Sequence, residues 1–578
     1  MPQSTSAPHG APTAPTATAM PAPTLDERGR WLALITVLIG TFMILLDSTI
    51  VNVAIPSIQR TLSASYQSIE SIISGYALAY GLLLIPAGRL GDRFGHKRLF
   101  LIGLIGFTAA SAACGTARSV EALIAWRVIQ GAMAGVMNPQ ITAVIQLAFP
   151  PRERGRAFGI YGSVIGIATA MGPLVGGLLI AANINGLEWE PIFLINIPIG
   201  VIAVIMAMRT LQQTFGRGGS LDLVGIVLIS AAVLLLTVPL IEGRPQGWPL
   251  WTWLSMGGSI VTLAIFAWWE HRRIDAHQAP LVDVRLFHSR AFTAGMGIAL
   301  AYFGGFVGIF FVSSLLLQNG MGHSALYSGL TVMPFSFGSM ISASQSDKVA
   351  RRLGRNCLTL GTILVMIGIA GLIVTMRQQG TDLTGWQLAI WFLIAGFGSG
   401  LVVAPNVTLV LAGVPREDAG SASGVLSATQ RVGQAIGICL VGIVLFGVLE
   451  TGAPAAADRV SDTLRSDLVA AQMPSDQVEG GVATFQHCFA ERAAASDPTA
   501  TPDGCPTASP GASDPVSTAF AKAASTALSD SFIRASEQAL IVSFGLVALT
   551  FLLVFALPRR VADGGGGRGH DGPPPAAE

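Results

Sequence analysis

Charged residues are scarce in this chain of 578 amino acids, at 12% of the sequence, whereas hydrophobic residues make up 51%. A mean hydropathy of +0.61 is too high for a soluble globular protein, in which about 25% of residues are charged. The chain also has no Gly-Lys dipeptide, which excludes a phosphate-binding loop of the Gly-x-x-x-x-Gly-Lys-Ser/Thr type. The composition therefore indicates a polytopic membrane protein, and an ATP-driven pump would need a separate subunit.

No cluster of His, Cys, Asp and Glu is spaced for a catalytic metal, so we expect neither an enzyme nor a metal or organic cofactor. The net charge of +1 conceals strong segregation of charge between the two faces of the membrane. We therefore expect no nucleic-acid partner. The expected state is a monomer in the lipid bilayer.

Fourteen apolar stretches of the chain are long enough to cross a membrane as α-helices. A spanning helix needs about 20 residues to cover a hydrocarbon core of about 30 Å, and it satisfies its own backbone hydrogen bonds there. The predicted fold class is therefore an all-α membrane protein. The predicted spans are residues 31–58, 68–87, 99–117, 119–147, 157–182, 191–208, 221–241, 250–269, 291–317, 325–345, 357–376, 386–412, 420–449 and 537–557.

The distribution of basic residues predicts the orientation. Arginine and lysine are frequent in alternate connections between spans and rare in the connections on the other face. Because basic residues are retained on the cytoplasmic side, both termini are predicted to lie in the cytoplasm of a protein of the cell membrane. Residues 1–30 and 559–578 are rich in small residues, proline or glycine, and are predicted to be disordered cytoplasmic tails.

A densely charged segment, residues 88–98, separates the second and third spans. Its glycines permit a tight reversal and its basic side chains mark the cytoplasmic face, so it is predicted to be a loop. It resembles the signature between helices 2 and 3 of the major facilitator superfamily, which implies a cytoplasmic gating role. The matching residues are Gly88, Leu90, Asp92, Arg93, Gly95, Lys97 and Arg98. His96 departs from the pattern, and a weaker copy follows around Asp347.

Asp47 lies within the first span, where a carboxylate costs about 2.5–3.5 kcal/mol and so needs a cavity or a partner. Its surroundings, Leu-Asp-Ser-Thr-Ile-Val-Asn-Val-Ala-Ile-Pro, resemble the first-helix signature of the drug:proton antiporter subfamily with fourteen helices. In the fourth span Arg127 and Gln130 lie near one face, and the helical rise lets Arg127 reach the depth of Asp47. Arg127 resembles the family's arginine for proton transfer. Proton or substrate coupling and a structural ion pair both remain open.

The fifth span combines regularly spaced glycines with a Gly-Pro step. Glycines three or four residues apart let another helix approach closely, and proline removes a helical hydrogen bond. The pattern resembles the antiporter signature of the same subfamily, which implies exchange rather than uptake, although ordinary small-residue packing is the alternative. Its residues are Gly162, Gly166, Gly172, Pro173, Gly176 and Gly177.

Further candidates lie in the second half of the chain. Arg431 is an intramembrane charge, for which proton or substrate coupling and a paired or snorkelling role are both open. Residues 450–536 are predicted to be a long outer loop with little to form a core. In this segment Cys488 and Cys505 face the oxidising side and are candidates for a disulfide bond. Aromatic candidates for an apolar binding surface are Tyr302, Phe303, Phe306, Phe310, Phe311, Phe335 and Phe337.

The resemblance implies a major facilitator fold, with six-helix halves at 31–208 and 291–558 and two inserted helices in the linker 209–290. The implied function is a proton-coupled antiporter that exports hydrophobic small molecules, such as drugs, antibiotics or natural products, with the proton gradient as its only energy source. A facilitator-type uniporter or a proton symporter for a small metabolite is the alternative.

Overall fold

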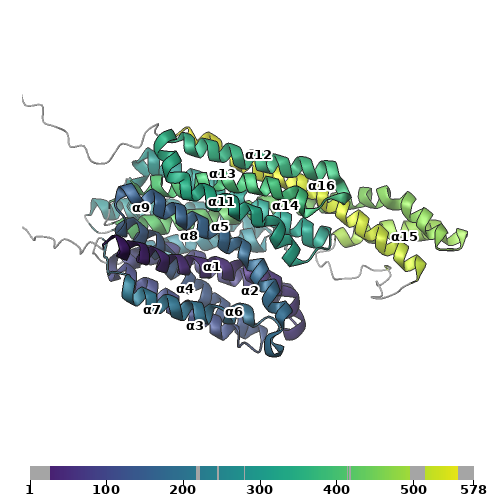
Figure 1. Ribbon diagram of the computed structural model, residues 1–578, viewed down its shortest axis with the longest axis horizontal. Helices are drawn as coiled ribbons and strands as arrows, with labels where there is room; N and C mark the ends of the chain where they lie inside the picture. Colours follow the sequence, from purple (N-terminus) through teal and green to yellow (C-terminus); the bar gives the residue numbers. More distant parts are fainter. Residues whose placement is uncertain are drawn as a thin grey trace, which may run out of the picture.

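The computed structural model describes residues 26–64, 66–216, 222–243, 246–276, 278, 280–412, 414–415, 418–494, 505 and 514–557. All regular structure in this part of the chain is helical (Figure 1). The first helices are α1 (Glu27–Leu62), α2 (Tyr66–Phe94), α3 (His96–Cys114), α4 (Val120–Ala148), α5 (Pro151–Ala182), η1 (Ile184–Gly186), α6 (Pro191–Leu194), α7 (Asn196–Thr210), α8 (Leu223–Glu242) and α9 (Leu250–Asp275). They are followed by η2 (Val284–His288), α10 (Arg290–Leu315), η3 (Leu316–Gly320), α11 (Ala325–Leu353), α12 (Asn356–Gln379), η4 (Gly380–Asp382), α13 (Gly385–Ala412), α14 (Ala419–Ala470), α15 (Ser475–Ala494) and α16 (Pro515–Val554).

Each predicted span falls on a helix, and twelve helical stretches in the described residues are long and apolar enough to cross a membrane. The predicted spans that miss this criterion are the ones on α5 and α11. Both helices are rich in glycine or serine, and they pack against each other along their length. Since a helix that faces other helices needs few lipid-compatible side chains, their lower hydropathy follows from their position in the bundle.

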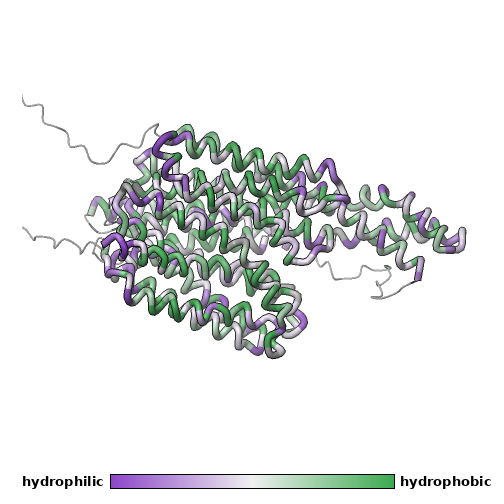
Figure 2. Tube along the Cα trace, in the orientation of Figure 1, coloured by the Kyte–Doolittle hydropathy of each residue, from purple (hydrophilic) through white to green (hydrophobic). Residues whose placement is uncertain are grey.

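The long helices run side by side along one axis, and hydrophilic residues concentrate toward the ends of the bundle (Figures 1 and 2). In one group α2 packs on α4, and α3 packs on α4 and α7, with α1 against α5. In another group α10 packs on α14 and α16, α12 on α13 and α16, and α11 on α13. Two seams join the groups, one between α5 and α11 and one between α2 and α14.

One end of the bundle, which we call the terminal end, holds the start of α1 and the end of α16. There Arg30 near the start of α1 lies 3.3 Å from Glu153 in the first turn of α5. Arg355 donates hydrogen bonds to the carbonyl groups of Phe555 and Leu557, directly after α16. The connection between α2 and α3 and the start of α14 belong to the same end. The opposite end carries α15 and is called the α15 end.

The predicted N-terminal tail is too long by four residues, because Glu27–Arg30 belong to α1. Asp26 caps this helix, and its carboxylate accepts a hydrogen bond from the Gly29 N–H at 2.9 Å. Residues 1–25 and 558–578 lie outside the described part of the chain.

Residues 88–98 were predicted to form a loop, and this prediction is wrong. α2 continues through Phe94 and α3 begins at His96, so Gly95 alone separates the two helices. Gly95 has φ +97°, a conformation that glycine adopts without steric cost. The last turns of α2 stay helical because Arg89 and Asp92 are buried there, on the helix that packs against α14.

The outer loop predicted at 450–536 is also wrong, because most of this segment is helical. α14 continues to Ala470, and together with α15 and the first half of α16 it projects beyond the bundle (Figure 1). Val460, Leu464 and Leu468 form a stripe at helical spacing that shares an apolar core with α15 and α16. The prediction failed because each helix contributes a narrow stripe, in which alanine supplies much of the apolar surface. We call this three-helix unit the α15 extension.

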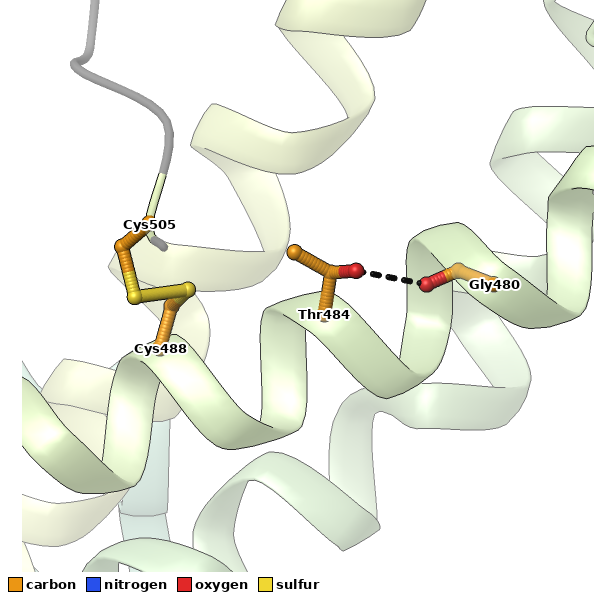
Figure 3. The surroundings of a disulfide bond; sticks show 4 residues. All are labelled: Gly480, Thr484, Cys488 and Cys505. Atoms are coloured by element: carbon orange, nitrogen blue, oxygen red, sulfur yellow. Dashed lines mark hydrogen bonds between the residues drawn. A yellow bond between two sulfur atoms is a disulfide. The ribbon is translucent and has the colours of Figure 1, made fainter. Parts of the chain in front are cut away.

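Cys488 and Cys505 form a disulfide bond in the α15 extension (Figure 3). The bond attaches Cys505 to α15, one turn beyond Thr484, whose hydroxyl donates to the Gly480 carbonyl. On the surface of the extension, Arg465 donates two hydrogen bonds to Glu479, at 2.7 and 3.2 Å. These hydrogen bonds and the adjacent positive charge hold the pKa of Glu479 below its ordinary value. Cys114 and Cys357 are buried and carry free thiols.

Candidate transport site

Asp47 is fully buried and is held by polar side chains from two other helices. Arg127 on α4 donates to Asp47 Oδ2 at 2.6 Å, and Gln130, one turn along, donates to Oδ1 at 2.8 Å. Arg127 also donates to the Gln130 side-chain oxygen at 2.8 Å, and Asn196 on α7 donates to Asp47 Oδ1 at 3.3 Å. The sequence predicted that Arg127 lies at the depth of Asp47, and the structure shows a direct ion pair between them. The negative charge of Asp47 is thus compensated by residues of the helices α4 and α7, which pack around α1.

Two partners of this pair, Tyr76 and Asn196, were missed by sequence reasoning. The ring of Tyr76 lies 4.1 Å from the Arg127 guanidinium carbon, an arrangement that stabilises a buried cation. Asn196 donates to Ser111 as well as to Asp47, so it connects α3 with α1. A usable signal for Asn196 existed, because an amide inside the apolar run 191–208 is itself unusual in a membrane helix.

A central cavity of about 730 Å³ lies between α1, α4, α5, α10, α11 and α14. On α1, Ser48 and Thr49 line it, whereas the preceding residue, Asp47, points toward α4. The cavity reaches the α15 end, because its lining includes Gln59 near the end of α1 and Asn319 in the π-helical turn η3. It therefore opens toward the α15 end, opposite to the terminal end of the bundle.

Aromatic side chains form one wall of this cavity. Of the seven predicted aromatic residues, those that line it are Phe303, Phe306, Phe310 and Phe311. Phe335 stands behind this wall, with its ring centroid 4.9 Å from Phe310 and 5.7 Å from Phe306. Tyr302 is buried among the helices, and Phe337 is 48% exposed on the outer surface of the bundle, so neither lines the cavity.

Arg431 on α14 is the only charged side chain in the described lining of the cavity. Its Nη2 donates to the Tyr80 hydroxyl at 3.1 Å, and its Nη1 donates to Gln434 at 2.9 Å. The guanidinium carbon lies 4.5 Å from the centre of the Tyr80 ring. No carboxylate forms an ion pair with Arg431 in the part of the chain that the structure describes. Sequence reasoning missed Tyr80, whose hydroxyl orients this cation from α2.

The terminal end of the bundle is closed by contacts across the seam between α2 and α14. The Asp92 carboxylate accepts hydrogen bonds from the backbone N–H groups of Gly420 and Ser421, at 3.0 and 2.9 Å. These N–H groups belong to the first turn of α14, where a helix has free donors and a partial positive charge. Gly88 lies against the backbone of Gly420 so closely that no side chain would fit between them. Asp92 therefore holds the two groups of helices together.

The other predicted gating residues do not cross this seam. Lys97 donates to the Met208 carbonyl at 2.8 Å, which ties α3 to α7. Arg93 and Arg98 are exposed, and the Arg93 guanidinium lies 5.3 Å from the centre of the neighbouring Phe94 ring. The structure thus brings Gly88 and Asp92 to the seam, and it leaves the basic residues of the signature at the surface or within one group of helices.

The weaker copy around Asp347 has a related position in the second seam. Asp347 is near the end of α11, and its side chain lies against Gly155 in the second turn of α5. It also forms an ion pair with Arg351 at 2.6 Å, one turn along the same helix. Asp92 therefore meets the start of α14, and Asp347 meets the start of α5. The position of the motif is repeated, whereas its polar contacts differ.

The glycines of the pattern in α5 face two different neighbours, and of these only Gly172 and Gly176 make close contacts, both with α1. A side chain at Gly172 would overlap Thr49 on α1, and a Cβ at Gly176 would lie 2.8 Å from Ile50 Cγ1. The other glycines of the pattern face α11 and α13 at ordinary contact distances: Gly162, Gly166 and Gly177. α5 continues through Pro173 without interruption. The closest contacts thus press α5 against the turn of α1 that follows Asp47.

This arrangement defines a class of protein: a polytopic helical transporter with a central cavity between two packed groups of helices. Residues 37–438 match the model of the Major Facilitator Superfamily, and the chain belongs to this family. It is therefore a membrane transporter and not an enzyme.

Proteins similar to this chain include antibiotic exporters and resistance proteins. The chain is 36% identical over 533 residues to a probable actinorhodin transporter of Streptomyces coelicolor, with 92% of each chain covered. It is 33% identical over 457 residues to a tetracenomycin C resistance and export protein of Streptomyces glaucescens, covering 78% of this chain and 81% of that one. A solved structure of the human organic anion transporter MFSD10 shares the fold, with a TM-score of 0.52, 16% identity, and 72% and 93% of the two chains covered.

Proposed function

We propose that this protein is a proton-coupled antiporter that exports hydrophobic small molecules across the cytoplasmic membrane. The observation that carries this proposal is the arrangement of three consecutive residues of α1. Asp47 pairs with Arg127, whereas Ser48 and Thr49 line the cavity. A buried carboxylate takes up a proton when its cationic partner moves away, because burial then disfavours its charge. Proton binding and substrate binding therefore act on the same turn of one helix.

Two further features support export by exchange. The relative from Streptomyces glaucescens is named a resistance and export protein, and export is the direction of transport that we propose here. The contact between α5 and α1 at Gly172 and Gly176 lies directly beyond Asp47, so a shift of α1 on protonation is transmitted to α5. α5 in turn packs on α11 across the seam.

The proposed topology has fourteen spans, with α5 and α11 added to the twelve apolar stretches. It consists of six-helix halves at 31–208 and 291–558 and a linker at 209–290 that contributes α8 and α9. We place the terminal end in the cytoplasm, because the basic residues of the α2–α3, α4–α5 and α11–α12 connections gather there. The α15 extension then lies outside the cell, where a disulfide bond is stable.

In this orientation the structure corresponds to an outward-open state, with the cavity facing outside and the seams closed inside. The proposed cycle rocks the two halves around the cavity, and protonation of Asp47 loosens the contacts made by Asp92 and Asp347. One inward proton contributes about 2.3 kcal/mol per 100 mV. At roughly 150 mV this energy supports a gradient of a few hundredfold for a neutral substrate, which is sufficient for resistance.

The test uses the full chain in proteoliposomes that contain a pH-sensitive dye. A gradient of a hydrophobic compound should drive protons in the opposite direction, and Asp47→Asn should abolish the proton signal. Asp222→Asn is a suitable control, because Asp222 is a buried carboxylate that caps α8 away from the cavity. Proton movement in the same direction as the compound would favour the symporter, and compound movement without any proton signal would favour the uniporter.

A further inference from the structure

The charge inside the central cavity indicates which substrates it accepts. Arg431 is the one charged residue in the described lining, and no lining residue is acidic. Asp47 lies beside the cavity on α1, but its charge is already neutralised by Arg127 and its oxygens are occupied by Arg127, Gln130 and Asn196. The cavity therefore carries a net positive charge that the protein itself leaves uncompensated.

Arg431 is held in a fixed position but keeps donors for a ligand. The guanidinium group has five N–H donors, and the described residues accept two of them, at Tyr80 and Gln434. The Tyr80 ring on one side restricts how the guanidinium plane can turn. A planar, oriented fork of this kind matches a carboxylate or another delocalised oxyanion.

The other residues that line the cavity favour ligands with aromatic rings. Phe303, Phe306 and Phe310 supply flat apolar surface, and the amide groups of Gln430 and Gln434 supply hydrogen bonds. Phenylalanine faces also attract cations, which opposes the effect of Arg431. That attraction does not offset the cost of removing a cation from water. A cationic ligand would have no carboxylate partner in the cavity and would be repelled by the guanidinium group of Arg431.

We propose that the cavity binds aromatic compounds that carry a negative charge, with the anionic group of the substrate on Arg431 and its rings against the phenylalanine wall. This inference deepens the proposed function, since it assumes that the cavity is the transport site. It has a consequence for energetics, because export of a monoanion in exchange for one inward proton moves two charges per cycle instead of one.

The experiment measures binding of a matched fluorescent series to the purified full chain in lipid nanodiscs at pH 7.5. The series keeps one ring system and changes its charge: anthracene-9-carboxylate, anthracene-9-carboxamide and (anthracen-9-ylmethyl)trimethylammonium. We expect the carboxylate to bind at least tenfold more tightly than the ammonium compound, with the amide between them. Equal affinities, or tighter binding of the cation, would overturn the inference without requiring any variant.

Variants then assign the preference to one residue. Arg431→Gln should weaken carboxylate binding about tenfold and leave amide binding within about twofold, because only a charge-assisted hydrogen bond is lost. Arg431→Lys should restore part of the preference, and Tyr80→Phe, which keeps all charges, should preserve most of it. Retained amide binding shows that each variant is folded. An anion preference that survives in Arg431→Gln would overturn the role of Arg431.

These results are separable from the test of antiport. Binding of the carboxylate without any substrate-driven proton flux would contradict the proposed exchange mechanism but leave the ligand class intact. Proton-coupled export of the ammonium compound, together with tighter binding of that compound, would support the antiporter and refute the anionic substrate.

Discussion

The Asp47 carboxylate lies 2.6 Å from the Arg127 guanidinium group, and neither side chain lines the central cavity. The pair is enclosed by α1, α4 and α7, so its stability depends on the N-terminal group of helices alone. The cavity depends on both groups, and the one cation in its described lining comes from α14. Asp47, the candidate for proton binding, and Ser48, which lines the candidate substrate cavity, are thus consecutive residues of α1.

Neutralising Asp47 should abolish coupling while the protein still inserts. In Asp47→Asn the side chain still accepts hydrogen bonds from Arg127 or Gln130, but it no longer takes up or releases a proton. We expect normal membrane levels, retained substrate binding and no substrate-driven proton release in proteoliposomes. Normal proton release by this variant would leave Asp47 with a purely structural role.

Removing only the Arg127 charge from the ion pair should reduce the stability of the protein more than removing the charges of both Arg127 and Asp47. Arg127→Gln leaves an uncompensated buried carboxylate, which costs about 3–5 kcal/mol. The double variant Asp47→Asn/Arg127→Gln buries no charge, and it should recover most of that loss without recovering transport. Thermal unfolding in detergent and uphill export measure the two quantities. Equal melting temperatures for Arg127→Gln and the wild type would contradict this account.

Asp92→Asn should impair cycling more than Asp347→Asn. Asp92 accepts two backbone hydrogen bonds from α14, and each such bond to a charged group contributes about 1.5–3 kcal/mol. Asp347 lies against α5 and pairs with Arg351 on its own helix. Transport rates in vesicles, corrected for protein amount, provide the comparison. Equal losses would mean that the two copies of the motif act equivalently.

Gly176→Leu should uncouple transport more than it reduces insertion. The added side chain meets Ile50 on α1, and overpacking of this kind costs about 1–3 kcal/mol or forces the helices apart. We expect a protein that reaches the membrane and binds substrate but leaks protons or loses uphill export. Leu178→Phe is the matched control, because Leu178 is 55% exposed on the same helix. Undiminished uphill export in Gly176→Leu would leave this contact as ordinary packing.

Removing the disulfide bond should affect the α15 extension and spare transport. Cys488 and Cys505 are 17 residues apart, and closing a loop of this size stabilises a folded unit by about 3 kcal/mol in the chain-entropy model. The pair of changes Cys488→Ser and Cys505→Ser should accelerate proteolysis of the extension in intact cells at unchanged export. The apolar core formed by Val460, Leu464 and their partners should keep the helices assembled. A complete loss of export would show that the extension acts in the transport cycle.

Much of the architecture could be predicted from the sequence, because the membrane imposes a length and a polarity on every spanning segment. The predicted spans all fall on helices, and family membership was predicted correctly from short motifs. The partnership of Asp47 with Arg127 was also predictable, since helical rise fixes the depth of each residue and a buried charge needs an opposite one.

Boundaries and non-membrane parts were harder to predict. The glycines and charges of residues 88–98 indicated a loop, yet burial of Arg89 and Asp92 against α14 keeps this segment helical up to Gly95. The alanine-rich segment after residue 450 had no strong apolar run, yet three weak stripes together form a core. In both cases a contact with a distant segment stabilises a helix that local composition does not specify.

The sequence by itself determined which stretches form long apolar helices and that Asp47 and Arg127 are buried within them, because hydropathy and helical spacing are local properties. Only the tertiary structure decided which way these charges point. Asp47 turns toward α4 and Ser48 toward the cavity, and Arg431 reaches the cavity with Tyr80 of α2 as its support. These orientations depend on how helices separated by hundreds of residues pack around a common space, and no local pattern encodes that packing.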